Sequence, residues 1–124
     1  MIDPIADFLT RIRNAQMARQ DRVELPYSII KEQIAQVMQK NNFLKAVHTA
    51  KTGKVKVLQV ELPEKKLNLK RVSKCGQRIY IGAKDVRKVV NGFGIAVLST
   101  SDGVMTGYEA RSRNIGGELL CEIS

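Results

Sequence analysis

The sequence is organised around residues 95–106, which read Ile95-Ala96-Val97-Leu98-Ser99-Thr100-Ser101-Asp102-Gly103-Val104-Met105-Thr106. The apolar run 95–98 is bounded by a glycine and by hydroxyl residues, so we predict a buried strand rather than a helix. The hydroxyls of Ser99, Thr100 and Ser101 then lie at the end of this strand. Uncharged donors and acceptors of this kind suit the sugar, phosphate and base edges of folded RNA. A hairpin turn that caps its own backbone is the structural alternative.

Length and composition predict one domain or two small lobes with a shared core. The chain has 124 residues, of which 44% are hydrophobic, and this is enough to bury a core. Lys and Arg number 21 against 12 Asp and Glu, a formal net charge of +9. Such an excess is typical of proteins that bind polyanions, either nucleic acid or an anionic membrane surface. Because the sequence has neither a membrane-spanning apolar run nor a targeting segment, we expect a soluble intracellular protein without membrane contact.

The residue types that catalysis needs are sparse. Cys75 and Cys121 form no Cys-x-x-Cys pair and His48 is the single histidine, so we expect no metal, no cofactor and two reduced thiols. An enzyme would need a base held against a nucleophile, and the scattered acids suggest no such pair. We therefore expect a binding protein and not an enzyme.

Two amphipathic helices are predicted in the first half of the chain. Apolar residues at steps of three and four after Asp3-Pro4 indicate a helix over residues 4–17, and Ser28 caps a second helix that ends near residue 41. On the first helix, Thr10 and Asn14 fall opposite the apolar stripe and Arg13 lies at its flank. This polar face is either a second RNA contact or a solvated helix surface.

Three strands accompany these helices. Residues 22–25 alternate and stop at a proline, which predicts a strand at the edge of a sheet. Residues 43–50 and 55–62 predict a hairpin around Gly53. Because the apolar pattern changes its register at Val57-Leu58, we expect either a bulge or a change from one-sided to two-sided burial at that point.

Pro63 marks the expected boundary between two lobes, residues 1–62 and residues 63–124, because the charge density changes after it. Between residues 65 and 88 there are nine basic residues and one acid, Asp85, a local charge of 9 − 1 = +8. Lys70, Arg71 and Lys74 lie within this segment. Basic residues spread over strands and loops could neutralise several phosphates, and such binding weakens steeply with salt.

The second lobe is expected to be mostly β with a short helical turn at residues 85–90. Tyr80 lies on a predicted strand, where it either stacks on a base or bridges core and surface. Thr106 and Glu109 fit a capping box. Residues 118–123 predict a last strand, with Leu119, Cys121 and Ile123 on one side and Glu118 and Glu122 on the other. Gly116 and Gly117 would let a protein strand or a ribose approach.

Several of these stretches together resemble a known family, the bacterial-type small-subunit ribosomal protein eight. The match runs from end to end, and its motifs stand in the family's order and spacing. The motifs are Asp3-Pro4-Ile5-Ala6-Asp7, Leu9-Thr10-Arg11-Ile12-Arg13-Asn14-Ala15, Asn91-Gly92-Phe93-Gly94-Ile95, Ser99-Thr100-Ser101, Gly103-Val104-Met105-Thr106, Glu109-Ala110 and Gly116-Gly117-Glu118-Leu119-Leu120-Cys121.

The resemblance implies an α+β fold of two lobes, an N-terminal α-β-α-β-β lobe and a mostly β C-terminal lobe. It also implies a monomeric, primary binder of the central domain of small-subunit ribosomal RNA, which helps to assemble the platform beside ribosomal proteins five and twelve. The location implied is the ribosome of the cytoplasm or of an organelle. Some members also repress their own messenger RNA.

The resemblance further implies RNA contacts at three places in this chain. These are the hydroxyl loop with Ser99, Thr100 and Ser101, the strand entry with Gly116, Gly117 and Glu118, and the helix face with Thr10, Arg13 and Asn14.

The chain departs from the family pattern at Cys75, Asp102, Gly107-Tyr108 and Ser124. Asp102 matters most, because it places a negative charge beside the expected RNA loop. A regulator that binds RNA away from the ribosome would use the same contact residues and differ only in its partner.

Overall fold

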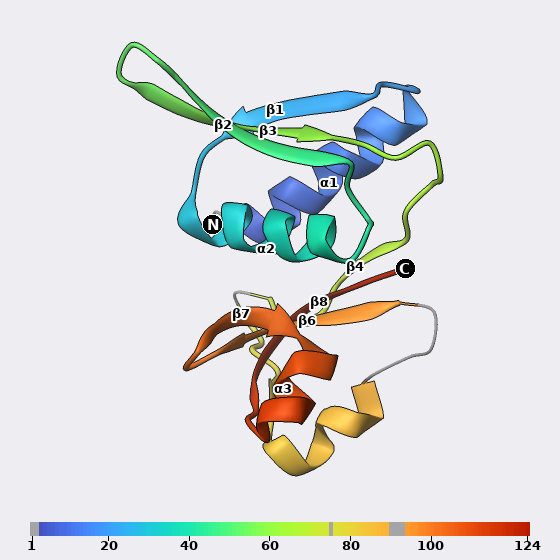
Figure 1. The fold of residues 1–124 in the computed structure, drawn as a ribbon, viewed down its shortest axis with the longest axis vertical. Helices are drawn as coiled ribbons and strands as arrows, with labels where there is room; N and C mark the ends of the chain where they lie inside the picture. The colour runs from blue at the N-terminus through green and yellow to red at the C-terminus, as the bar shows by residue number, and fades with distance from the viewer. Residues whose placement is uncertain (1–2, 75, 90–93) are drawn as a thin grey trace. The chain divides into compact units, whose positions relative to one another are not determined.

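Two antiparallel sheets, each with its own helices, make up the fold (Figure 1). The structure, a computed structural model, describes residues 3–74, 76–89 and 94–124. Residues 4–67 form the first unit, and Asp3 with residues 68–124 forms the second unit. Helices and sheets in both units confirm the predicted α+β class. Residues 63–67, which follow the boundary expected from the sequence, lie with the first unit.

The first unit has the element order α-β-α-β-β expected from the resemblance. Its elements are α1 (Pro4–Met17), β1 (Arg22–Pro26), α2 (Ile29–Lys40), β2 (Ala46–Thr52) and β3 (Val55–Glu61). The strands pair in the order β1-β3-β2, so β1 is an edge strand as predicted. Both helices lie on the same face of this sheet (Figure 1).

The helical spacing of apolar residues creates the core of the first unit. In α1 the buried side chains recur at steps of three and four, and Ser28 caps α2 by accepting a hydrogen bond from the Lys31 amide at 3.2 Å. The two helices and the face of the sheet that they cover bury apolar side chains. These are Ile5, Phe8, Leu9, Ile12, Ala15, Leu25, Ile34, Ala35, Met38, Leu58 and Val60.

The β2–β3 hairpin keeps one register along its whole length. Ala46 pairs with Glu61 and Thr52 with Val55, without a break between them, so the bulge considered at Val57-Leu58 is absent from this ladder. Leu58 and Val60 are buried, whereas Val55 is 60% exposed. The apolar pattern changes because valines near the tip lie on the open face of the sheet, where no helix covers them.

The side chain of Gln16 holds the end of the first unit in place. Its amide nitrogen donates to the carbonyls of Pro63 at 3.3 Å and Lys65 at 3.0 Å, and its amide oxygen accepts from the Leu67 amide at 2.9 Å. One glutamine on α1 thus satisfies three backbone groups of a segment without regular structure. These bonds explain why residues 63–67 stay with the first unit.

The second unit is built around β8 (Gly117–Ile123). The other elements are β4 (Leu69–Arg71), β5 (Tyr80–Ile81), the 3-10 helix η1 (Ala83–Val89), β6 (Ile95–Thr100), β7 (Gly103–Thr106) and α3 (Gly107–Arg113). The strand order is β4-β8-β6-β7, and β5 pairs with β8 beyond the end of β4. Thr106 accepts a hydrogen bond from the Glu109 amide at 3.2 Å and so caps α3 as predicted. The predicted helix stop at residues 91–92 lies outside the described residues.

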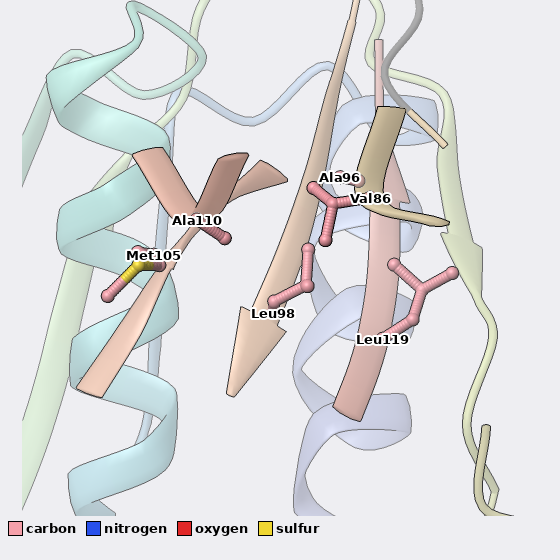
Figure 2. Close-up of a cluster of buried hydrophobic side chains, with 6 residues drawn as sticks. All are labelled: Val86, Ala96, Leu98, Met105, Ala110 and Leu119. Atoms are coloured by element: carbon pink, nitrogen blue, oxygen red, sulfur yellow. The ribbon is translucent and has the colours of Figure 1, made fainter. Parts of the chain in front are cut away.

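A buried cluster beneath α3 forms the core of the second unit (Figure 2). Its side chains come from η1, β6, β7, α3 and β8. The members are Val86, Ala96, Leu98, Met105, Ala110 and Leu119. Most of these residues lie on β6 and its two neighbouring strands, and they point toward α3. The residues next to them in each strand therefore lie on the opposite face of the sheet.

The prediction that Leu119, Cys121 and Ile123 share one face of the last strand is wrong. Val97 pairs with Cys121 but Leu98 pairs with Leu119, so Leu120 has no partner on β6. Such a bulge moves the side chains that follow it to the opposite face. Leu119 therefore joins the core beneath α3, and Glu118 shares the other face with Cys121. The sequence pattern did not indicate the bulge, because Leu119 and Leu120 are both apolar and both buried.

Replacing Gln16 with alanine tests the role of this residue in the first unit. The Gln16→Ala variant leaves two carbonyls and one amide without their partner, so we expect a loss of about 1–3 kcal/mol in the free energy of unfolding. Urea denaturation measures this loss. The matched control is Gln36→Ala, which removes an exposed glutamine from α2 and should change stability much less. Equal losses in the two variants would contradict the role of Gln16.

Candidate nucleic-acid interface

Four neighbouring strands bring several of the predicted site residues into one row. Tyr80 on β5 pairs with Glu118 on β8, Glu118 pairs with Ser99 on β6, and Ser99 pairs with Val104 on β7. Directly paired residues of antiparallel strands point to the same face, with β-carbons about 5 Å apart. The row therefore spans roughly 15 Å. It lies on the sheet face opposite α3, since Leu98 and Leu119 point into the cluster beneath that helix.

The row contains both stacking and hydrogen-bonding groups. Tyr80 is 72% exposed, which favours a free aromatic ring over a tyrosine that bridges core and surface. Ser99 is half-buried, and Ser101 is exposed in the turn that follows β6. Neither serine hydroxyl bonds to any residue in the described part of the chain. These hydroxyls are therefore available to donate to and accept from a ligand.

The Thr100 hydroxyl has a different role from its neighbours. It donates to the Gly103 carbonyl at 2.8 Å and accepts from the Asp102 amide at 3.1 Å. This is the backbone-capping turn that the sequence left open as the structural alternative, and it applies to Thr100 alone. Gly103 adopts a φ of +112°, which L side chains rarely adopt. Thr100 and Gly103 thus shape the hairpin that presents Ser99 and Ser101.

Two glycines allow the strands of the row to approach one another. A β-carbon on Gly117 would overlap the Ser99 carbonyl oxygen, and one on Gly116 would overlap the Ile81 carbonyl oxygen. The sequence left open whether a protein strand or a ribose approaches here, and the structure places the protein's own backbone against both residues. A direct RNA contact at Gly116 or Gly117 stays a prediction.

Arginines accompany both carboxylates of this surface. Arg78 donates to Glu118 at 3.1 Å, and Arg113 lies 3.8 Å from Asp102. The negative charge that Asp102 adds beside the hydroxyl turn is therefore partly balanced. We did not single out Arg78 or Arg113 from the sequence. The signals were the position of Arg78 two residues before Tyr80, and the basic residues in the last turn of α3.

The basic residues around β4 have different structural roles. Lys70 and Lys74 are exposed, and Lys70 pairs with Glu122 on the face of the sheet that α3 covers. The side chain of Arg71 is only 11% exposed. It bonds to Asp3 at 3.2 Å and donates to the Leu120 carbonyl at 2.6 Å. These contacts account for Arg71 within the fold, so Lys70 and Lys74 are the better candidates for phosphate contacts.

The predicted residues of α1 belong to the first unit. Thr10, Arg13 and Asn14 are all exposed, as their helical positions predicted. Asn14 also lines a groove of about 430 Å³ between α1 and β1, together with Arg11 and Arg22. Arginine and amide side chains along a groove suit phosphate and sugar contacts.

Other classes of site find no support in the part of the chain that the structure describes. The described residues include no group of three or more His, Cys, Asp or Glu side chains that could hold a metal ion. None of the helices among them is both long and apolar enough to span a membrane. Cys121 is a free, buried thiol, whereas Cys75 lies outside the described residues.

Comparison with known proteins gives one consistent result. A family model described as "Ribosomal protein S8" matches residues 3–124. The "Small ribosomal subunit protein uS8" of Staphylococcus carnosus is 48% identical over 129 residues, which cover 99% of this chain and 98% of the relative. The protein of the same name from Staphylococcus saprophyticus is 50% identical over 124 residues, which cover 95% and 94% of the two chains. The Enterococcus faecalis protein of that name is 47% identical, with 99% and 98% covered.

The buried thiol of Cys121 gives a test of the sheet beneath this surface. Burial raises the pKa of Cys121 from 9.0 to about 12, against the lowering effect of Arg71. The thiolate fraction at pH 8 is then roughly a thousandfold lower than in an open thiol. In a Cys75→Ser background, we expect iodoacetamide to label Cys121 at pH 8 only after denaturation.

The same pKa shift sets a pH dependence of stability. The folded protein holds the Cys121 proton more tightly than the unfolded chain does. The resulting contribution to the free energy of unfolding is therefore complete below about pH 9 and is lost as the pH rises toward 12. For the labelling test at pH 8, rapid reaction of iodoacetamide with Cys121 in the native protein would contradict the expected protection and show that the β8 region opens in solution.

Proposed function

Because the chain belongs to the Ribosomal protein S8 family, we propose that it is a structural constituent of the small ribosomal subunit that binds ribosomal RNA. The observation that carries this proposal is the cross-strand row of Tyr80, Glu118 and Ser99, with the Ser101 turn beside it. The row offers an aromatic ring and free hydroxyls on a rigid sheet. Irregular RNA helices expose bases and 2′-hydroxyls that such groups recognise.

The proposed RNA is the central domain of small-subunit ribosomal RNA, as the family resemblance implies. In this role the protein acts without catalysis or cofactor, as a monomer in the ribosome of the cytoplasm. It binds early and helps to fold the platform, beside ribosomal proteins five and twelve. Repression of its own messenger RNA, where it occurs, would use the same surface and needs no further residue.

In this proposal, selectivity for the RNA and overall affinity for polyanions come from different side chains. Ser99 and Ser101 donate and accept without carrying charge, so their contacts depend on the position of RNA atoms and not only on phosphate charge. Thr100 keeps one acceptor lone pair beside the two hydrogen bonds of its turn. Lys70 and Lys74 supply attraction to any polyanion. Gly116, Gly117, Thr10, Arg13 and Asn14 complete the proposed contact set.

Removing the free hydroxyls should reduce selectivity while leaving the fold intact. For the double variant Ser99→Ala and Ser101→Ala, we expect a loss of roughly 1–3 kcal/mol of discrimination for each base contact removed. The measurement compares affinity for a central-domain transcript with affinity for a scrambled transcript. Ser112→Ala, an exposed serine of α3, is the matched control and should discriminate as the wild type does. Unchanged discrimination in the double variant would argue against direct readout by these serines.

Neutralising Lys70 and Lys74 should weaken binding to every RNA. Each phosphate contact contributes about 0.9 to the slope of log affinity against log salt, so the variant Lys70→Gln and Lys74→Gln should lower this slope by roughly 1–2. Filter binding across a series of KCl concentrations measures the slope. Arg71 is left unchanged, because its buried contacts would confuse binding with folding. A slope equal to that of the wild type would place the phosphate contacts elsewhere.

A further inference from the structure

The tip of the β2–β3 hairpin carries positive charge that the proposed function leaves unused. Residues 33–60 contain five lysines and neither Asp nor Glu. Three of them, Lys51, Lys54 and Lys56, lie at the tip of the hairpin and are exposed. Figure 1 shows that this tip extends beyond the helices of its own unit. The charge therefore projects into solvent at the far end of the first unit's sheet.

Two of these lysines are arranged in a way that costs stability. Lys51 pairs directly with Lys56 in the antiparallel ladder, and like charges in directly paired positions destabilise a sheet. None of the three tip lysines forms an ion pair with a described residue. No acidic residue in the described part of the chain therefore offsets the repulsion between Lys51 and Lys56.

The base of the hairpin is nevertheless held in a defined position. The Lys56 ammonium lies 3.9 Å from the centre of the Tyr27 ring, a cation–π contact that holds the side chain against the ring. The Tyr27 amide also donates to the Lys56 carbonyl at 3.1 Å. The lysines are therefore presented by an ordered ladder fixed to the chain that enters α2, and not by a loose tail.

We propose that Lys51, Lys54 and Lys56 form a second phosphate-binding site for RNA, separate from the surface on the second unit. Two or three phosphates would relieve the repulsion between Lys51 and Lys56 and release condensed counterions. This inference rests on the proposed function for the identity of the polyanion. The alternative role for these lysines is protection of β2, an edge strand, against pairing with another chain, and this role would leave RNA binding unchanged.

The test uses the full chain and a transcript of the central domain of small-subunit ribosomal RNA. In the variant Lys51→Gln and Lys54→Gln, the slope of log affinity against log salt should fall by roughly 1–2, and affinity near 0.1 M KCl should fall roughly tenfold. The matched control is Lys40→Gln and Lys45→Gln. It removes the same charge from exposed positions of the same unit, beyond the other end of β2 and on the order of 20 Å away along the strand.

A single charge reversal separates binding from folding. Lys51→Glu replaces a like-charge pair with an opposite-charge pair across the ladder, so its urea midpoint should equal or exceed that of the wild type. Its affinity for RNA should nevertheless fall by about as much as that of the double Gln variant, because both variants lower the formal charge of the tip by two. A variant that is at least as stable but binds less tightly cannot owe its defect to misfolding.

The outcomes separate this inference from the proposed function. Equal slopes for the wild type and the hairpin variant would overturn the inference, and so would equal reductions in the hairpin and control variants. If the wild type bound scrambled RNA as tightly as the cognate transcript, the proposed function would fail. The difference in slope would still test the hairpin, because phosphate contacts do not depend on sequence.

Discussion

The close backbone approach at Gly116 and Gly117 is the constraint on which the proposed binding surface depends. Without β-carbons, these residues let β8 lie against the carbonyls of Ser99 and Ile81, so β8 reaches β6 and β5 at the same point. The row of Tyr80, Glu118 and Ser99 exists because those three strands meet there. Any side chain at Gly117 would have to move the Ser99 backbone, and a shift of that kind would move the whole row.

Much of the fold followed from local patterns in the sequence. Helical spacing located α1 and α2, Ser28 and Thr106 were correctly identified as the caps of α2 and α3, and a proline marked the end of β1. The bulge at Leu120 did not follow, because its position depends on which residues of β6 pair with β8. The roles of Gln16 and Arg71 were missed for the same reason. Both bond to backbone groups about 50 residues away, which no local pattern reveals.

The candidate site was predictable as a set of residue types but not as a surface. The sequence singled out Tyr80, Ser99 and Glu118 separately, and only strand pairing placed them in one row. It also could not distinguish Thr100, whose hydroxyl is used by its own turn, from Ser99 and Ser101, whose hydroxyls are free. Three adjacent residues of one chemical kind therefore differ in their hydrogen bonding. The Thr100 hydroxyl differs because it bonds to the Gly103 carbonyl and to the Asp102 amide within its own turn.

Charge is arranged differently on the two candidate RNA surfaces, and the difference has a physical meaning. Beside the hydroxyl row each carboxylate has an arginine partner, Arg78 for Glu118 and Arg113 for Asp102. Such pairing lowers the net local field and leaves selectivity to short hydrogen bonds, which act only at contact distance. At the hairpin tip Lys51 faces Lys56 and none of the tip lysines forms an ion pair with a described acid, so the field there acts over about a Debye length, roughly 10 Å at 0.1 M salt. In the proposed binding mode, this long-range attraction guides an RNA toward the protein before its bases are aligned, and the short-range row then decides whether that RNA stays bound.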